Sequence, residues 1–573
     1  MEQILAALNR TPTELEKVFL KAMLNSVRRQ NPFPGLGQQK PAVLSIPPAG
    51  DLRLTLAVEC KQALVPTSIQ RECARYGITN RLVLKTPWAT FAAGLFSSAD
   101  GNQISLKAGN RIFFLNQNRN LQVIIAEIIA RPWFRKTCVV NPYGLGAAYL
   151  DCLKDENLGL MLHVDDPAEL KRIYSRKVKG LLVIIQEGFE QTLAEICQGE
   201  GITPEFLGTI VEKEHFILQQ GKRQLFSLPR TILPEMENNS TLFSNKPYQV
   251  ATPSGIPEIE EPQHYAEILD RLQKAKEQDQ HESIFYVNQE FSWPSKRGGN
   301  SQLHLTLLSG SRPYLCSLDP YKGGSSTVAL VARELVCRGV NPLGVVAVIH
   351  GQNWQGDEQQ ARLMAMVQGC REACAALQLP LLDITVTEKE TKNVFCEAAV
   401  VGTSGREPIP CVFREAGEFV SMLGSHRGEL GGSLYLRVMH DFPDGPIPTL
   451  DLPMEKRLHE ALLQGFQTGL LKSAANVGSG GLGVTLLTCL QRSPDETGAR
   501  IFLSRKLRNN EIVFGETQGL VLITLGEDDL MEFERICMSV GVPSTTIGRV
   551  TDDGQLKFND LFTVNVKEVF SED

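Results

Sequence analysis

The sequence predicts an α+β protein that is built from two related halves. Hydrophobic residues make up 42% of its 573 residues, which is enough for packed cores and excludes wholesale disorder. Short apolar runs alternate with amphipathic stretches and Gly-containing turns, which is typical of mixed strands and helices. Segments of the first half recur in the same order in the second half. The length suggests about three to four domains.

The internal repeat has two parts. The first, YGLGAAYLDCL at 143–153, matches GGLGVTLLTCL at 480–490, and the second joins residues 180–211 to residues 519–550. The offset is nearly constant at roughly 340 residues, far longer than the 20–50 residues of a solenoid repeat. Chance similarity of two α/β units is the alternative. Because several glycines and a Cys-Leu pair align together, we favour an ancestral duplication.

Each copy of the repeat predicts a turn, a helix, a buried strand, a second helix and a second strand. The apolar runs LLVII at 181–185 and LVLIT at 520–524 indicate buried strands. The stretches at 190–201 and 529–541 have helical periodicity and end at glycine, the residue that most often terminates a helix.

The remaining elements follow in chain order. Residues 11–30 predict a helix, with Thr11 or Thr13 as its cap, and residues 42–116 predict strands with one or two helices. A polar, charged stretch that ends near residue 283 predicts a linker with one exposed helix, and a second globular part follows it.

Charge and cysteine content exclude several classes of protein. The formal net charge of −7 argues against a general nucleic-acid binder, which needs a basic face. The 13 cysteines show no paired metal-ligand spacing, so we expect reduced core thiols, with Cys152 and Cys489 at matching repeat positions. The start of the chain lacks the features of a signal peptide, and no apolar run reaches the ~18 residues of a membrane span. These observations predict a cytoplasmic protein that binds no membrane.

The turn Asp319-Pro320-Tyr321-Lys322-Gly323-Gly324 runs directly into an amphipathic helical pattern. One interpretation is ordinary capping of the helix by Asp319. The other is an anion or metal-phosphate site, in which the aspartate holds magnesium and the glycines offer backbone N–H groups.

These residues, with others, resemble a known family. DPYKGG at 319–324, RGELGG at 427–432 and FGETQG at 514–519 resemble motifs in the large subunit of phosphoribosylformylglycinamidine synthase, a PurL-like member of the AIR synthase (PurM-like) superfamily. The resemblance is specific in the second half and weaker in the first. It implies a fold of duplicated halves, each with an N-domain and a C-domain of mixed sheets flanked by helices.

The resemblance also implies where the domains lie. It places a linker-like helical segment at 1–38, a shortened first N-domain at 39–118, the first C-domain at 119–235 and a linker at 236–283. The second N-domain is expected at 284–418 and the second C-domain at 419–573.

The family is an ATP-dependent carbon–nitrogen ligase of purine biosynthesis, so the resemblance implies ATP or ADP with Mg²⁺. It also implies protein partners, either a glutaminase-like chain or further copies of this chain. The implied metal ligands are Asp319 and Glu59. The implied nucleotide-binding residues are Asp319, Tyr321, Gly323, Gly324, Glu429 and Glu516.

The chain departs from the family at the residues that carry the chemistry. Lys61 and Ala63 replace the two histidines of a family loop, Asn476 and Ser479 replace two aspartates of a glycine turn, and Leu520 replaces an arginine. The first-half counterpart of that turn, residues 141–144, also lacks an acid. We therefore assign no catalytic residue. His350, at the end of an apolar run, is interpreted as structural, with catalysis as the alternative.

Three functional hypotheses remain at this point. The first is a catalytically impaired homologue, a pseudoenzyme that keeps one nucleotide site and acts through association. The second is a divergent active synthase subunit, with Glu59, Asp319, Asp383 and Glu388 as replacement magnesium ligands. The third is a structural subunit without any ligand.

Overall fold

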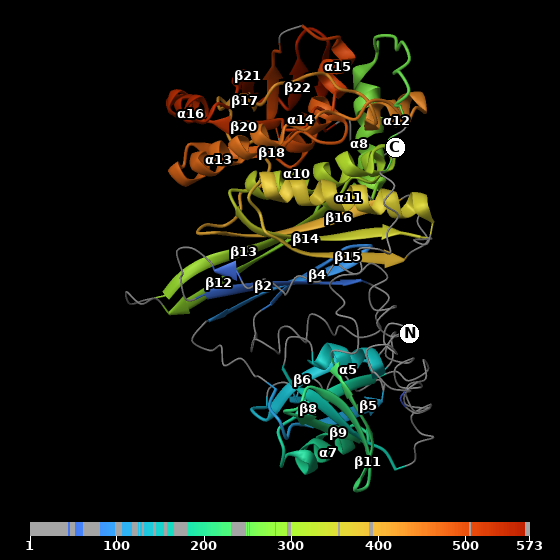
Figure 1. The fold of residues 1–573 in the computed structure, drawn as a ribbon. Coiled ribbons are helices and arrows are strands. Elements are labelled where there is room, and N and C mark those ends of the chain that lie inside the picture. The colour runs from blue at the N-terminus through green and yellow to red at the C-terminus, as the bar shows by residue number, and fades with distance from the viewer. Residues whose placement is uncertain are drawn as a thin grey trace. The chain divides into compact units, whose positions relative to one another are not determined.

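In a computed structural model of the chain, the described strands form four β-sheets (Figure 1). The structure describes residues 16, 44–45, 52–60, 81–97, 106–116, 124, 127–128, 131–140, 145–153, 157–165, 180–230, 248, 250, 252–280, 282–294, 300–352, 356–388, 394–494, 496–503 and 506–567. The predicted helix at 11–30 lies outside this set except for Glu16, which is helical.

The chain divides into two units, one formed by residues 1–81 and 92–242 and the other by residues 82–91 and 243–573. A four-stranded sheet in the order β1-β2-β4-β3 lies in the region predicted as the first N-domain. Its strands are β1 (Leu44–Ser45), β2 (Leu52–Cys60), β3 (Arg81–Lys85) and β4 (Ala89–Ser97).

A seven-stranded sheet forms the core of the first unit, in the order β11-β10-β7-β9-β5-β8-β6. Its strands are β5 (Arg111–Asn116), β6 (Phe134–Val139), β7 (Gly159–His163), β8 (Gly180–Ile185), β9 (Glu205–Val211), β10 (His215–Gln220) and β11 (Arg223–Pro229), with helices α5 (Leu145–Leu153) and α7 (Glu190–Gly199). All six residues of β8 are buried, as its apolar run predicts.

A second seven-stranded sheet lies near the C-terminus, in the order β18-β20-β17-β21-β19-β22-β23. Its strands are β17 (Phe419–Leu423), β18 (Leu471–Asn476), β19 (Gly498–Ile501), β20 (Val521–Leu525), β21 (Ser544–Thr551), β22 (Gln555–Phe558) and β23 (Phe562–Asn565). The accompanying helices are α12 (Leu434–His440), α13 (Leu452–Thr468), α14 (Gly481–Gln491), α15 (Asn509–Phe514) and α16 (Glu527–Val540).

The two seven-stranded sheets have the same topology, which confirms the duplication. Strand by strand, β6, β8, β5, β9, β7, β10 and β11 correspond to β18, β20, β17, β21, β19, β22 and β23. Even the pairing direction is shared, because β7–β10 and β19–β22 are both parallel whereas the remaining strand pairs of the two sheets are antiparallel. Helices α5 and α14 occupy equivalent places in the chain, and so do α7 and α16.

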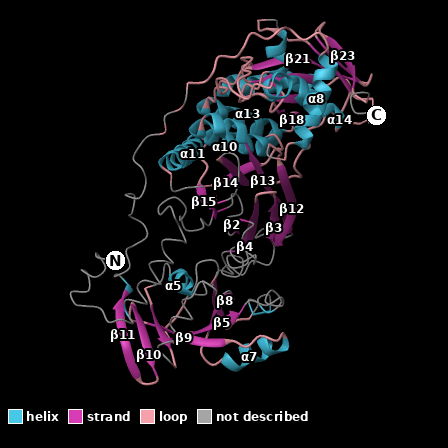
Figure 2. Cartoon of the chain, turned by 90° about the vertical axis from the view of Figure 1, so that its right-hand side faces the viewer, coloured by secondary structure: helices cyan, strands magenta, loops and turns pink. Residues whose placement is uncertain are grey.

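A five-stranded sheet, β12-β13-β16-β14-β15, carries the predicted second N-domain. Its strands are β12 (Phe285–Pro294), β13 (Asn300–Ser311), β14 (Asn341–Gly351), β15 (Leu381–Glu388) and β16 (Phe395–Ser404), and its helices are α9 (Pro313–Leu318), α10 (Pro320–Val336) and α11 (Asp357–Ala376). Helices α10 and α11 pack against each other, and α10 lies over β13 and β16 (Figure 1). Figure 2 shows α13 beside this helix pair, which brings the two sheet domains of the second unit together.

The prediction of an exposed helix in the charged linker is wrong. Helix α8 (Tyr265–Gln278) buries Tyr265, Leu269 and Leu272 against α12, α14 and β23. The charged residues of this stretch mask an apolar stripe at helical spacing, and that stripe packs on the C-terminal sheet domain. In the part of the chain that the structure describes, none of the helices has the length and apolar composition of a membrane span.

Candidate functional site

Asp319 is the junction between helices α9 and α10. Its backbone ends α9, and its Oδ1 accepts a hydrogen bond from the Lys322 N–H at 3.1 Å, so that the side chain caps α10. Pro320 follows at the first helical position, where its missing N–H costs no hydrogen bond. Asp319 is only 5% exposed. The capping interpretation therefore describes its geometry, and a contact with nucleotide or metal remains a prediction.

Gly323 and Gly324 allow α10 to approach its neighbours closely. A Cβ atom at Gly323 would lie 2.4 Å from the Cα of Cys316 in α9, and one at Gly324 would lie 2.5 Å from the carbonyl oxygen of Met366 in α11. The Gly323 N–H already donates to the Asp319 carbonyl at 2.8 Å. This amide is therefore used within the helix, and helix packing explains why both positions are glycine.

Tyr321 and Lys322 are the outer residues of the same turn. The Tyr321 hydroxyl donates to the Glu372 carboxylate, and this hydrogen bond, with burial, raises the pKa of Tyr321 to about 12. The Lys322 ammonium lies 4.0 Å from the Asp319 carboxylate and its side chain is 59% exposed. Lys322 is thus the accessible charged group at this turn.

Glu516 joins the first turns of two helices. Its Oε1 accepts hydrogen bonds from the N–H groups of Leu434, at the start of α12, and Gly480, which precedes α14, at 2.7 and 2.8 Å. Its Oε2 lies 3.8 Å from Nη1 of Arg312. Burial raises the pKa of Glu516 above its ordinary value, and the charge of Arg312 offsets this only in part.

Glu429 lies next to Glu516 and is partly exposed. Its carbonyl oxygen accepts from the Glu516 N–H at 2.8 Å, while its carboxylate accepts from the Thr449 N–H at 2.8 Å and from Arg427 at 3.1 Å. The predicted residues therefore form two groups, Asp319–Gly324 on the helical layer and Glu429 with Glu516 in the C-terminal sheet domain. Arg312 directly precedes α9 in the five-stranded sheet domain, and its side chain reaches Glu516 in the C-terminal sheet domain.

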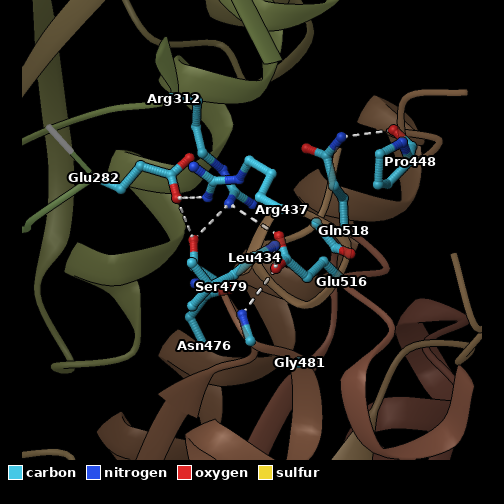
Figure 3. Close-up of polar contacts among 12 residues, drawn as sticks. Glu282, Arg312, Leu434, Arg437, Pro448, Asn476, Ser479, Gly481, Glu516 and Gln518 are labelled. Atoms are coloured by element: carbon cyan, nitrogen blue, oxygen red, sulfur yellow. Dashed lines mark hydrogen bonds and ion pairs between the residues drawn. The ribbon is translucent and has the colours of Figure 1, made fainter. Parts of the chain in front are cut away.

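A buried polar seam surrounds Arg312 (Figure 3). Arg312 donates to the Ser479 hydroxyl at 3.3 Å, and that hydroxyl donates to Glu282 at 2.8 Å. Arg437 also reaches Glu282, at 3.1 Å, and its guanidinium stacks on the ring of Tyr314. Ser479 stands at a position where the family resemblance implies an aspartate, and its hydroxyl is bound between an arginine and a glutamate.

A second part of the seam surrounds Arg333 of α10, whose side chain is fully buried. Its Nε donates to Asn476 Oδ1 at 2.6 Å, and its Nη1 contacts Glu455 Oε1 at 2.5 Å. His459 lies 3.2 Å from the same oxygen of Glu455. Burial by itself would raise the pKa of Glu455, but Arg333 and His459 together hold it below its ordinary value. Asn476, at the other position where the resemblance implies an aspartate, is thus bound to a buried guanidinium.

His350 is a buried residue of β14, packed against Trp88 and Phe395. Its Nδ1 lies 2.9 Å from the Thr387 hydroxyl, and its Nε2 lies 3.4 Å from Glu397 Oε2. These contacts across adjacent strands agree with the structural interpretation.

A magnesium site at the implied ligands stays a prediction, and the described residues hold no ready-made cluster for one. Among them, no group of three or more His, Cys, Asp or Glu side chains is arranged to hold a metal ion. One oxygen of Asp319 is already bound to the Lys322 N–H, and the Lys322 ammonium lies nearby. The side chain of Glu59, in β2, lies outside the described residues, and so do Lys61, Ala63 and residues 141–144.

The sequence analysis named none of the three seam arginines, Arg312, Arg333 and Arg437. Arg333 lies next to Glu334 in the mostly apolar run VALVARELV, and a charged residue on the buried face of a helix requires a buried partner. That signal was available in the sequence. The identity of the partner was not, because Asn476 is 143 residues away.

Two family models match the second half of the chain. "AIR synthase related protein, N-terminal domain" matches residues 299–404, and "AIR synthase related protein, C-terminal domain" matches residues 415–560.

Similar curated proteins include two subunits named phosphoribosylformylglycinamidine synthase subunit PurL. The one from Alkaliphilus metalliredigens is 25% identical over 466 residues, covering 76% of this chain and 61% of the relative. The one from Anaeromyxobacter dehalogenans is 29% identical over 280 residues, covering 46% of this chain and 37% of the relative. The chain therefore spans between about a third and three fifths of the length of these relatives.

Solved structures of Thermotoga maritima PurL share the fold along nearly the whole chain. The complex with ADP has a TM-score of 0.58 at 13% sequence identity, and it covers 96% of this chain and 98% of that one. The PurLQS structure from the same organism has a TM-score of 0.57 with the same coverage. The domain models, the relatives and the duplicated fold agree, and the chain is a PurL-like member of the AIR synthase superfamily.

Proposed function

We propose that this chain is a PurL-like protein whose synthase chemistry is impaired and which acts through association with other protein chains. The observation that carries this proposal is the seam of buried arginines. Arg333 binds Asn476 and Arg312 binds Ser479, at the two positions where the family resemblance implies aspartates.

The physical argument concerns charge. Mg²⁺ in phosphoryl-transfer sites is held by carboxylate oxygens. At these two positions the chain presents neutral oxygens that already accept hydrogen bonds from guanidinium groups. A divalent cation brought there would meet neutral oxygens at these two positions, and it would have to compete with Arg333 and Arg312 for the carboxylates of Glu455 and Glu516 that already pair with them. Leu520, which replaces a family arginine, is itself completely buried and joins the apolar core.

The proposal also includes a more specific claim, namely that a nucleotide binds at the Asp319–Gly324 turn. T. maritima PurL has been solved in complex with ATP and with ADP, and the fold is shared. At the turn of this chain, the exposed Lys322 ammonium is the group best placed to meet a phosphate, with the Asp319 carboxylate beside it. Protein partners, a glutaminase-like chain or further copies of this one, belong to the same proposal because a related complex is named PurLQS. The proposed function also includes a cytoplasmic location.

Isothermal titration of the purified chain with ATP and ADP, each with and without Mg²⁺, tests the proposal. We expect micromolar binding that does not depend on Mg²⁺ and that is lost in Lys322→Ala. Asp319→Asn keeps the cap but removes the charge, whereas Asp319→Ala removes both, so the pair separates capping from ligand contact.

Two other outcomes would each favour one of the two alternative hypotheses. Mg²⁺-dependent binding together with product formation in a synthase assay with an added glutaminase would favour the divergent active enzyme. No binding at millimolar nucleotide would favour a structural subunit without ligand.

A further inference from the structure

Two buried thiols of the first unit are in direct contact. Cys138 in β6 and Cys152 in α5 have their sulfur atoms 3.0 Å apart. Their exposed fractions are 0% and 1%, and both belong to the same hydrophobic core. At this separation nothing lies between the two sulfur atoms, so a small displacement of α5 relative to β6 is enough to bring them to bonding distance.

The nearest described pair of thiols in the five-stranded sheet domain is more widely spaced than this pair. Cys370 and Cys396 lie 3.6 Å apart on the helical face of the five-stranded sheet. Burial raises the pKa of Cys316 to about 12 and raises the pKa of Cys374 in the same domain. Beside the Cys138–Cys152 pair, the Lys136 ammonium donates to the carbonyl of Cys152 at 2.7 Å.

The duplication supplies an internal comparison. Cys152 corresponds to Cys489 in the repeat, and the same alignment sets Cys138 against Ala475. Both second-half residues are buried in the equivalent core. The fold of this domain therefore accepts alanine at the strand position, and packing alone does not require a second thiol there.

We propose that Cys138 and Cys152 form an oxidative modification site, at which a hydroperoxide converts the two thiols into an intramolecular disulfide. This inference does not depend on the proposed function.

The reaction balances as two steps. One thiol loses its proton, and the thiolate attacks an oxygen of the peroxide and becomes a sulfenic acid. The peroxide O–O bond breaks, and the leaving oxygen takes up the proton and departs as an alcohol, or as water when the peroxide is hydrogen peroxide. The second thiol then attacks the sulfenic sulfur, the S–S bond forms, and the hydroxyl leaves as water. The two sulfur atoms lose two electrons in total, and the peroxide gains them.

The disulfide would tie helix α5 to strand β6. The loop that it closes contains residues 141–144, the first-half counterpart of the family's glycine turn. Oxidation would thus restrain the entry to α5 and make the unfolding of the first unit harder.

The test is carried out on the full chain. After treatment with hydrogen peroxide, remaining thiols are alkylated in denaturant and the protein is digested without reductant. We expect a peptide that joins Cys138 to Cys152, and two fewer alkylated thiols than the 13 of the sequence. The mass of the intact chain before alkylation should fall by about 2 Da, the two hydrogens lost in a disulfide. Dithiothreitol should restore all of these values.

Cys152→Ser should abolish the cross-link, whereas Cys489→Ser, the matched variant in the second half, should leave it intact. Thermal unfolding of the two variants without peroxide shows whether each is folded. The proposal is overturned if both thiols of the wild type remain alkylatable after peroxide has oxidised other cysteines. A cross-link that forms first between Cys370 and Cys396 would overturn it equally.

Discussion

Replacement of Arg333 by methionine gives the sharpest test of the buried seam. Arg333 and Glu455 have no exposed side-chain surface, and their closest atoms are 2.5 Å apart. Methionine fills a similar volume but leaves the Glu455 carboxylate without its counter-charge. Breaking a fully buried ion pair in this way costs about 3–5 kcal/mol. Because His459 remains 3.2 Å from the carboxylate, we expect a value near the lower end, about 3 kcal/mol.

The assay is urea-induced unfolding followed by circular dichroism, with the free energy taken from the shift of the midpoint at unchanged slope. Arg535→Met is the matched control, because Arg535 pairs with Glu532 at 2.9 Å on the surface. That exposed pair should contribute less than about 1 kcal/mol.

The double variant Arg333→Met, Glu455→Leu completes the cycle. Replacing both charges by apolar side chains removes the unpaired carboxylate, so we expect it to be more stable than Arg333→Met alone. The reasoning is refuted if Arg333→Met costs no more than Arg535→Met. It is also refuted if the double variant is destabilised by the sum of its two single changes.

Three further predictions follow from the site. Glu516→Leu should lose about 2–4 kcal/mol of stability because two buried N–H groups lose their acceptor, whereas Glu516→Gln keeps an acceptor. Since the folded-state pKa of Glu516 is raised, its contribution is largest at low pH and declines as pH rises through that pKa. Glu516→Gln should therefore gain stability relative to wild type as the pH rises above the reference carboxyl pKa, which thermal melts at increasing pH measure. Glu455 has a lowered pKa, so its stabilisation is present above the ordinary carboxyl pKa and is lost in acid; Glu455→Gln should flatten the fall in melting temperature below about pH 4. Gly323→Ala should cost about 1–3 kcal/mol because its Cβ would meet backbone atoms of α9, whereas Gly199→Ala, in α7 with open space around it, should be neutral or stabilising by up to about 1 kcal/mol in the same melts.

The sequence by itself determined the α+β class and the duplication. Periodicity fixes strands such as β8 and β20 because buried strands read as continuous apolar runs, and α16 because its acidic first turn and Gly541 mark its two ends. These signals depend only on residues that are close together in the chain, so they can be read from a single sequence without aligning it to relatives. The motif at 319–324 was placed correctly at a helix start for the same reason.

Only the tertiary structure decided what the motif residues touch. Asp319 could be read as a cap or as a ligand, and the tertiary structure shows that its carboxylate caps α10 through the Lys322 N–H. Linker helix α8 appeared exposed because its charged and amide residues together outnumber its apolar ones, yet three apolar side chains on one face pack into the core. The pairing of Arg333 with Asn476 and of Arg312 with Ser479 joins residues more than 140 positions apart. Such contacts depend on how two domains pack, and no local pattern in the chain encodes them.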